Sequence, residues 1–68
     1  MDLKIELEQE DDGRWIAEIL NLPGVLAYGG SQEDAMARVK ALAFRVLAER
    51  IEHGEDLSQL DHVAFIAA

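Results

Sequence analysis

The chain has 68 residues, of which half are hydrophobic and none is cysteine, and its 14 Asp and Glu against 6 Lys and Arg give a net charge of −8. This length allows one domain, over residues 1–68, and the lack of cysteine excludes disulfides and thiolate metal sites. The negative charge disfavours nucleic acid and anionic membranes as partners, and it favours a cationic partner or serves solubility alone.

No apolar stretch approaches the roughly 20 residues that a membrane span needs. The first residues, Met1 to Ile5, lack the basic region and the apolar run of a secretory signal. We therefore expect a cytoplasmic protein without a membrane span. Because so small a domain has a thin margin of stability and no disulfide, we also expect it to associate with itself.

Apolar and charged residues alternate in the first segment, which predicts a strand whose buried face consists of Leu3, Ile5 and Leu7. Asp12-Gly13 then predicts a hairpin turn, because glycine accepts a positive φ without steric cost. The alternation resumes after the turn, on a face formed by Trp15, Ala17 and Ile19. We expect the two strands to pair antiparallel.

A second turn is predicted at Asn21-Leu22-Pro23-Gly24, since proline presets φ and glycine takes the unusual backbone position. Val25 to Tyr28 is a short apolar run with the composition of a strand, and Gly29-Gly30 ends it. The three segments together predict an antiparallel meander.

A long helix is predicted from Ser31 to His53. Ser31 with Asp34 three residues later is a variant of the capping box, and the acids of the first turn suit the helix dipole. Gly54 is the residue type preferred just past a helix end. One stripe at helical spacing is expected to face the sheet, and it consists of Ala35, Met36, Val39, Leu42, Ala43, Val46 and Leu47.

After a polar turn from Asp56 to Gln59, Val63 to Ile66 predicts a last strand. The expected order is β-β-β-α-β, an α+β fold with one helix packed on one face of a sheet.

A second apolar stripe lies on the opposite side of the predicted helix, at about 100° per residue, and consists of Ala37, Ala41, Phe44, Ala48 and Ile51. A helix packed on one sheet cannot bury both stripes. The alanines are good helix formers and one exposed Phe is ordinary, so the stripe has a purely local explanation. The alternative is a contact face for another subunit or for a partner protein. Our candidates for self-association are Phe44, Ile51, Ala41 and Ala48.

Groups that could carry out chemistry are few. Ser31 and Ser58 are explained by a cap and a turn, and His53 and His62 lack the spacing of a metal-binding pair. A metal-dependent nuclease would need converging carboxylates, for which the candidates are Glu6 or Glu8, Glu33 and Asp61. Glu6 and Glu8 are expected on the polar face of their strand, away from the helix. We therefore expect no enzyme activity, no metal and no cofactor.

The strongest local charge feature is the acidic hairpin tip. It is either a solvated turn or a docking point for Lys and Arg of a basic partner, where charge sets the on-rate and orientation. Our candidates for partner contact are Glu8, Glu10, Asp11, Asp12 and Trp15. Trp15 has a second interpretation as a core residue.

The ordered set of motifs resembles the HicB-like antitoxin family over residues 11–54. The resemblance is carried by the acidic-Gly turn and aromatic strand Asp12-Gly13-Arg14-Trp15-Ile16-Ala17-Glu18, by Leu22-Pro23-Gly24-Val25, by Tyr28-Gly29, and by the Ser-capped helix start from Ser31 to Ala35. Each piece alone is weak, since Leu-Pro-Gly occurs widely. The set at this spacing is more specific.

The resemblance implies a partial ribonuclease-H-like fold, self-association, and binding to a HicA-type toxin, a small basic RNA-cleaving protein. Many members carry a C-terminal DNA-binding module. Here the chain stops at Ala68 after the last predicted strand, so we expect no direct binding to nucleic acid. The leading hypothesis is an antitoxin that neutralises such a toxin by direct contact. The alternative is a self-associating domain of the same fold without a toxin partner.

Overall fold

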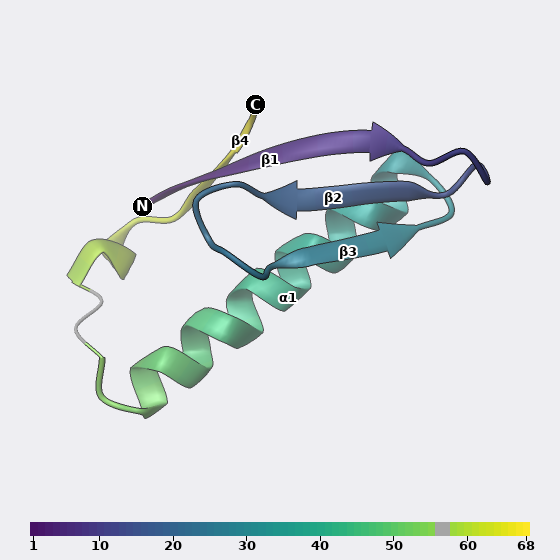
Figure 1. Cartoon of the computed structure of the whole chain (residues 1–68). Coiled ribbons are helices and arrows are strands. Elements are labelled where there is room, and N and C mark those ends of the chain that lie inside the picture. Colours follow the sequence, from purple (N-terminus) through teal and green to yellow (C-terminus); the bar gives the residue numbers. More distant parts are fainter. Residues whose placement is uncertain (56–57) are drawn as a thin grey trace.

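The elements follow the order β-β-β-α-β in a computed structural model that describes residues 1–55 and 58–68 (Figure 1). They are β1 (Asp2–Gln9), β2 (Trp15–Ile19), β3 (Leu26–Gly29), α1 (Gln32–Glu52), the 3₁₀ helix η1 (Ser58–Asp61) and β4 (Ala64–Ala67). The predicted α+β fold is confirmed. The predicted polar turn from Asp56 to Gln59 lies partly outside the described residues, and its last two residues begin η1.

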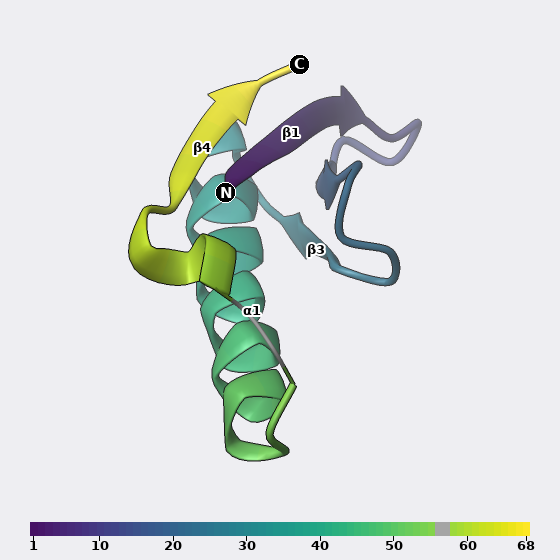
Figure 2. The same cartoon turned by 90° about the vertical axis from the view of Figure 1, so that its left-hand side faces the viewer.

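The strands form one mixed sheet in the order β3-β2-β1-β4. The pairs β1–β2 and β2–β3 are antiparallel, as the meander predicts, whereas β4 runs parallel to β1 along its free edge. The strands β3 and β4 therefore point the same way, and α1 is the crossover helix that parallel strands require. Figure 2 shows the helix against one face of the sheet, with β4 beside β1.

The core lies between that face and α1. The period of two places Leu3 and Ile5 of β1 on the same face of the sheet as Ala17 and Ile19 of β2, and all four are buried. The helix contributes Ala35, Val39, Ala43 and Leu47. Met36, Leu42 and Val46 of the predicted stripe are partly buried and pack against this core. The stripe prediction is confirmed, although its centre lies on the Ala35–Val39–Ala43–Leu47 row.

The β1–β2 turn uses Gly13 as predicted, at a different position in the turn. The Gly13 amide donates to the Glu10 carbonyl oxygen (2.9 Å), so Asp11 and Asp12 are the central residues. Gly13 has φ +91°, while no other residue type in the described ranges has a positive φ. A two-residue type I′ turn centred on Asp12-Gly13 would need a positive φ at both. The turn is instead a type I turn followed by a glycine bulge.

The β2–β3 connection explains the sequence Leu22-Pro23-Gly24-Val25. The Val25 amide donates to the Leu22 carbonyl oxygen (3.2 Å), and Gly24 has φ +84°. Proline followed by a glycine of positive φ at the two central positions is a type II turn. Leu22 and Val25 are both buried, so the ends of the turn belong to the core. The third strand begins at Leu26, one residue later than predicted.

The ends of α1 match the prediction. Ser31 is the N-cap, and its Oγ accepts from the Asp34 amide (3.1 Å). The shorter Asp34 side chain accepts from the Gly30 amide (3.1 Å), one residue before the amide that a full capping box would use. At the other end the Glu55 amide donates to Arg50 and the Gly54 amide to Ile51. These two bonds form a Schellman motif around Gly54.

The Asp34 cap predicts a pH-dependent stability. The Gly30 amide, and then the Arg38 guanidinium, hold the pKa of Asp34 below its ordinary value of 3.8. A depressed folded-state pKa stabilises the fold above the unfolded pKa, and this contribution is lost as the pH falls through the folded one. Asp34→Asn is therefore expected to lower the melting temperature at pH 7, with a smaller difference from the wild type below pH 3.8. Thermal melts of both proteins from pH 7 to below pH 3.8 test this prediction. A difference in melting temperature that does not change with pH would contradict it.

Candidate protein-interaction surfaces

The face of the sheet opposite α1 is uncovered by any described element (Figure 2). Successive side chains of a strand point to opposite faces of the sheet. Because Leu3 and Ala17 point toward α1, the residues that alternate with them point to this open face. By register, the open face carries Asp2, Lys4, Glu6, Glu8, Ile16, Glu18, Leu26, Tyr28, Ala64 and Ile66. Leu26, Tyr28 and Ile66 are exposed large apolar residues. The surface is therefore mixed, with mostly acidic residues and Lys4 on the two middle strands and apolar residues on both edge strands.

The acids of the open face are arranged unfavourably for the isolated chain. Glu6 of β1 lies directly opposite Glu18 of β2. Like charges at this position destabilise a strand pair. Within residues 1–55 and 58–68 neither carboxylate forms an ion pair, nor does that of Glu8. A cation brought to this face would relieve the repulsion.

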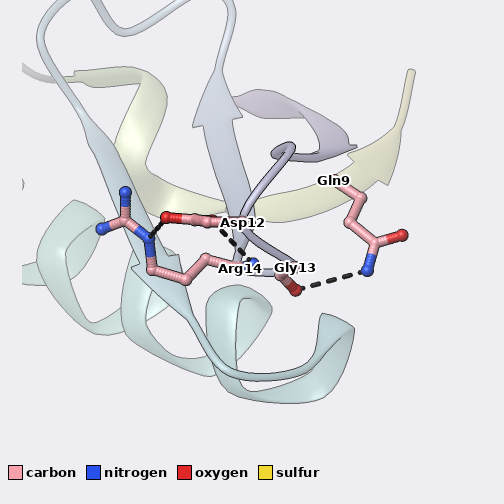
Figure 3. Close-up of polar contacts among 4 residues, drawn as sticks. All are labelled: Gln9, Asp12, Gly13 and Arg14. Carbon is pink, nitrogen blue, oxygen red and sulfur yellow. Dashed lines mark hydrogen bonds and ion pairs between the residues drawn. The ribbon is translucent and has the colours of Figure 1, made fainter.

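One residue of the acidic hairpin, Asp12, has a structural role in the turn. Asp12 accepts from the Arg14 amide (3.0 Å) and from Arg14 Nε (2.7 Å), as Figure 3 shows. The amide and then the guanidinium of Arg14 hold the pKa of Asp12 below its ordinary value. The guanidinium also stacks on Tyr28, with its Cζ 4.6 Å from the ring centroid. Asp12 therefore braces the turn, while Glu8 and Asp11 are exposed and Glu10 is partly buried.

Trp15 lies on the covered face of the sheet. It is partly buried, packs against the core and pairs with Gly29 of β3. Its neighbour in sequence, Ile16, points to the open face and pairs with Glu8 and Tyr28. The structure thus places Trp15 beside the core, on the face away from Glu8, and brings Glu8 together with residues that we did not select from the sequence. These residues could have been found from the sequence, because they alternate with the buried residues of each strand.

The outer side of α1 is the second candidate surface. All five residues of the predicted second stripe are exposed. The rings of Phe44 and Phe65 of β4 form a T-shaped contact, with centroids 5.5 Å apart and planes at 82°. Beside this pair, the helix, η1 and the segment before β4 line an apolar groove formed by Phe44, Leu47, Ala48, Ile51, Leu60 and Val63.

The carboxylates considered for a nuclease do not converge. Glu6 and Glu8 lie on the open face of the sheet, Glu33 lies on the helix across the other face, and Asp61 is in η1. The described residues contain no group of three or more His, Asp or Glu side chains that could hold a metal ion. Nδ1 of His53 donates to the Glu49 carbonyl oxygen (2.7 Å), which is a helix-end contact.

Comparison of the chain with protein-family models, with curated proteins and with solved structures finds no match. The described helices include none long and apolar enough to cross a membrane. The functional assignment therefore depends on the two surfaces and on the sequence motifs.

Proposed function

We infer that this chain is an antitoxin-type binding protein that acts in the cytoplasm and neutralises a small basic RNA-cleaving toxin of the HicA type by direct contact. The observation that carries the proposal is the open face of the sheet. On this face Glu6, Glu8 and Glu18 form no ion pair within the described part of the chain, and exposed apolar side chains flank them.

Charge and apolar area support this kind of partner together. A basic protein would remove the repulsion between Glu6 and Glu18, and the net charge of −8 would steer its approach. On the edge strands beside these acids, Tyr28, Leu26 and Ile66 would supply apolar contact. Tyrosine is among the residues that dominate binding energy at protein interfaces.

The sequence motifs indicate which class of partner to expect. The observed β-β-β-α-β order is the order that the resemblance to HicB-like antitoxins implies. The Leu-Pro-Gly-Val motif forms a type II turn with a buried end on each side, and the acidic-Gly motif forms the braced hairpin. Both motifs serve the fold and the presentation of the open face.

A charge reversal at Glu6 separates binding from stability. A lysine at this position would face Glu18 across the strand pair, and an opposite-charge pair there stabilises by about 0.2–1 kcal/mol. Glu6→Lys is therefore expected to melt at or above the wild-type temperature, yet to bind the basic partner about tenfold or more weakly. The chain would be co-expressed with the small basic protein encoded beside its gene, and pull-down and rescue of growth would be measured.

The matched control is Glu55→Lys, which makes the same change of net charge at an exposed position beyond the end of α1. It should retain binding and rescue. Equal loss in both variants would show that only net charge matters and would contradict a role for the open face. No complex and no rescue with the wild-type chain would overturn the antitoxin proposal and leave a self-associating domain.

A further inference from the structure

We propose that the outer side of α1 pairs with the same surface of a second copy of this chain, antiparallel, about a two-fold axis at Ala48. The inference is independent of the proposed function, since it concerns the chain alone. It also uses a different surface from the open face, because α1 lies against the other face of the sheet (Figure 2).

The surface has the features of an uncovered apolar contact. Phe44 and Ile51 are the most exposed of the large apolar residues in the described ranges, at 53% and 55%. The ring of Phe65 packs against Phe44 in a T-shaped contact, which favours this position of the Phe44 ring. Both residues border the groove with Leu60 and Val63, which gives an incoming side chain a pocket to fill.

The spacing of these residues is self-complementary. A two-fold antiparallel contact pairs residue i with residue j and residue j with residue i. Phe44 lies four positions before Ala48 and Ile51 three positions after it. An axis at Ala48 therefore brings each Phe44 to the partner's Ile51. The small Ala48 side chain at the centre allows the two helices to approach closely.

The charges beside the stripe select the same axis. Arg45 and Glu52 lie along one edge of the stripe, three positions before Ala48 and four after it. The same axis brings each Arg45 to the Glu52 of the other copy. Neither side chain has an ion-pair partner within the described residues, so both are available.

A parallel arrangement would lose these pairings. Arg45 and Glu52 lie on the edge of the stripe opposite to Phe44 and Ile51. A parallel two-fold contact exchanges the edges, so it would set Arg45 beside the partner's Phe44 and Glu52 beside the partner's Ile51. The antiparallel contact at Ala48 instead pairs apolar with apolar residues and Arg45 with Glu52, which favours it.

A charge swap tests the register. Sedimentation velocity over a series of concentrations should give a monomer–dimer equilibrium for the wild type. Arg45→Glu and Glu52→Arg should each weaken the dimer about tenfold, because each makes two like-charge contacts per dimer. The double variant Arg45→Glu/Glu52→Arg should restore it. A wild-type chain that is monomeric at every concentration, or a double variant weaker than both single variants, would overturn the proposal.

Cross-linking tests the position of the axis without relying on charge. The chain has no cysteine, so one introduced thiol is unique. Ala48→Cys should form a covalent dimer on mild oxidation, since the axis brings the two thiols together. Ala37→Cys is the matched control on the same exposed stripe, two helical turns or more from the axis, and should remain monomeric. Cross-linking of Ala37→Cys but not of Ala48→Cys would contradict the register.

Discussion

Replacing Gly29 with alanine is expected to lower the free energy of unfolding by about 3 kcal/mol, or to lower the melting temperature by roughly 12–24 °C. A Cβ at Gly29 would lie 2.4 Å from the backbone nitrogen of Ala35 and 2.9 Å from its Cα. These are main-chain atoms of the first turn of α1, so no flexible side chain can yield. Strand β3 and the helix would have to separate, which would loosen the packing of α1 on the sheet. Urea and thermal melts measure the loss.

Gly30→Ala is the matched control for this prediction. A Cβ added at this next residue would have no heavy atom within 4 Å, and Gly30 has no positive φ. The control is therefore expected to keep the wild-type stability within about 0.5 kcal/mol. Equal losses in both variants would show that loop flexibility, and not the close approach of β3 to α1, explains the glycine at position 29.

Leu3→Ala is expected to cost about 3 kcal/mol of unfolding free energy, within the usual range for truncating a buried leucine. Leu3 is 0% exposed, lies on the central strand β1 and pairs with Phe65 of β4. A domain of this size has roughly 3–10 kcal/mol of stability in total, so the variant should lose a large part of it and unfold at much lower urea concentrations. Circular dichroism during a urea titration reads this directly.

The comparison is with Leu20→Ala, the same chemical change at a residue that is 47% exposed. Its cost is expected to stay below about 1 kcal/mol, since little apolar area leaves the core. A similar cost at both positions would contradict the placement of the core between the sheet and α1.

Much of the fold could be predicted because its signals are local. The period of two in β1 and β2, the Pro-Gly turn and the Ser31 and Gly54 helix ends each depend on residues close together in sequence. All of them are confirmed in the structure. The position of β4 beside β1 could not be predicted, since two strand edges were available and no local pattern chooses between them.

The candidate surfaces were predicted unevenly for the same reason. The second stripe of α1 follows from helical periodicity and is exposed as expected. The acidic tip was visible as a run of charges, but the use of Asp12 to hold Arg14 needs coordinates. The opposition of Glu6 and Glu18, and their grouping with Tyr28, depend on strand register. Register arises from the whole sheet, and a single strand does not contain it.

The parallel pairing of β1 and β4 has a consequence for the folding kinetics of the chain. The partners Leu3 and Phe65 are 62 positions apart, whereas the meander and its contact with α1 join elements adjacent in sequence. Closing so long a loop costs more entropy than forming the hairpins, so β4 is expected to dock last and to open first. Val63 and Phe65 then arrive late as well, and one wall of the groove beside Phe44 is complete only after the two ends of the chain have met.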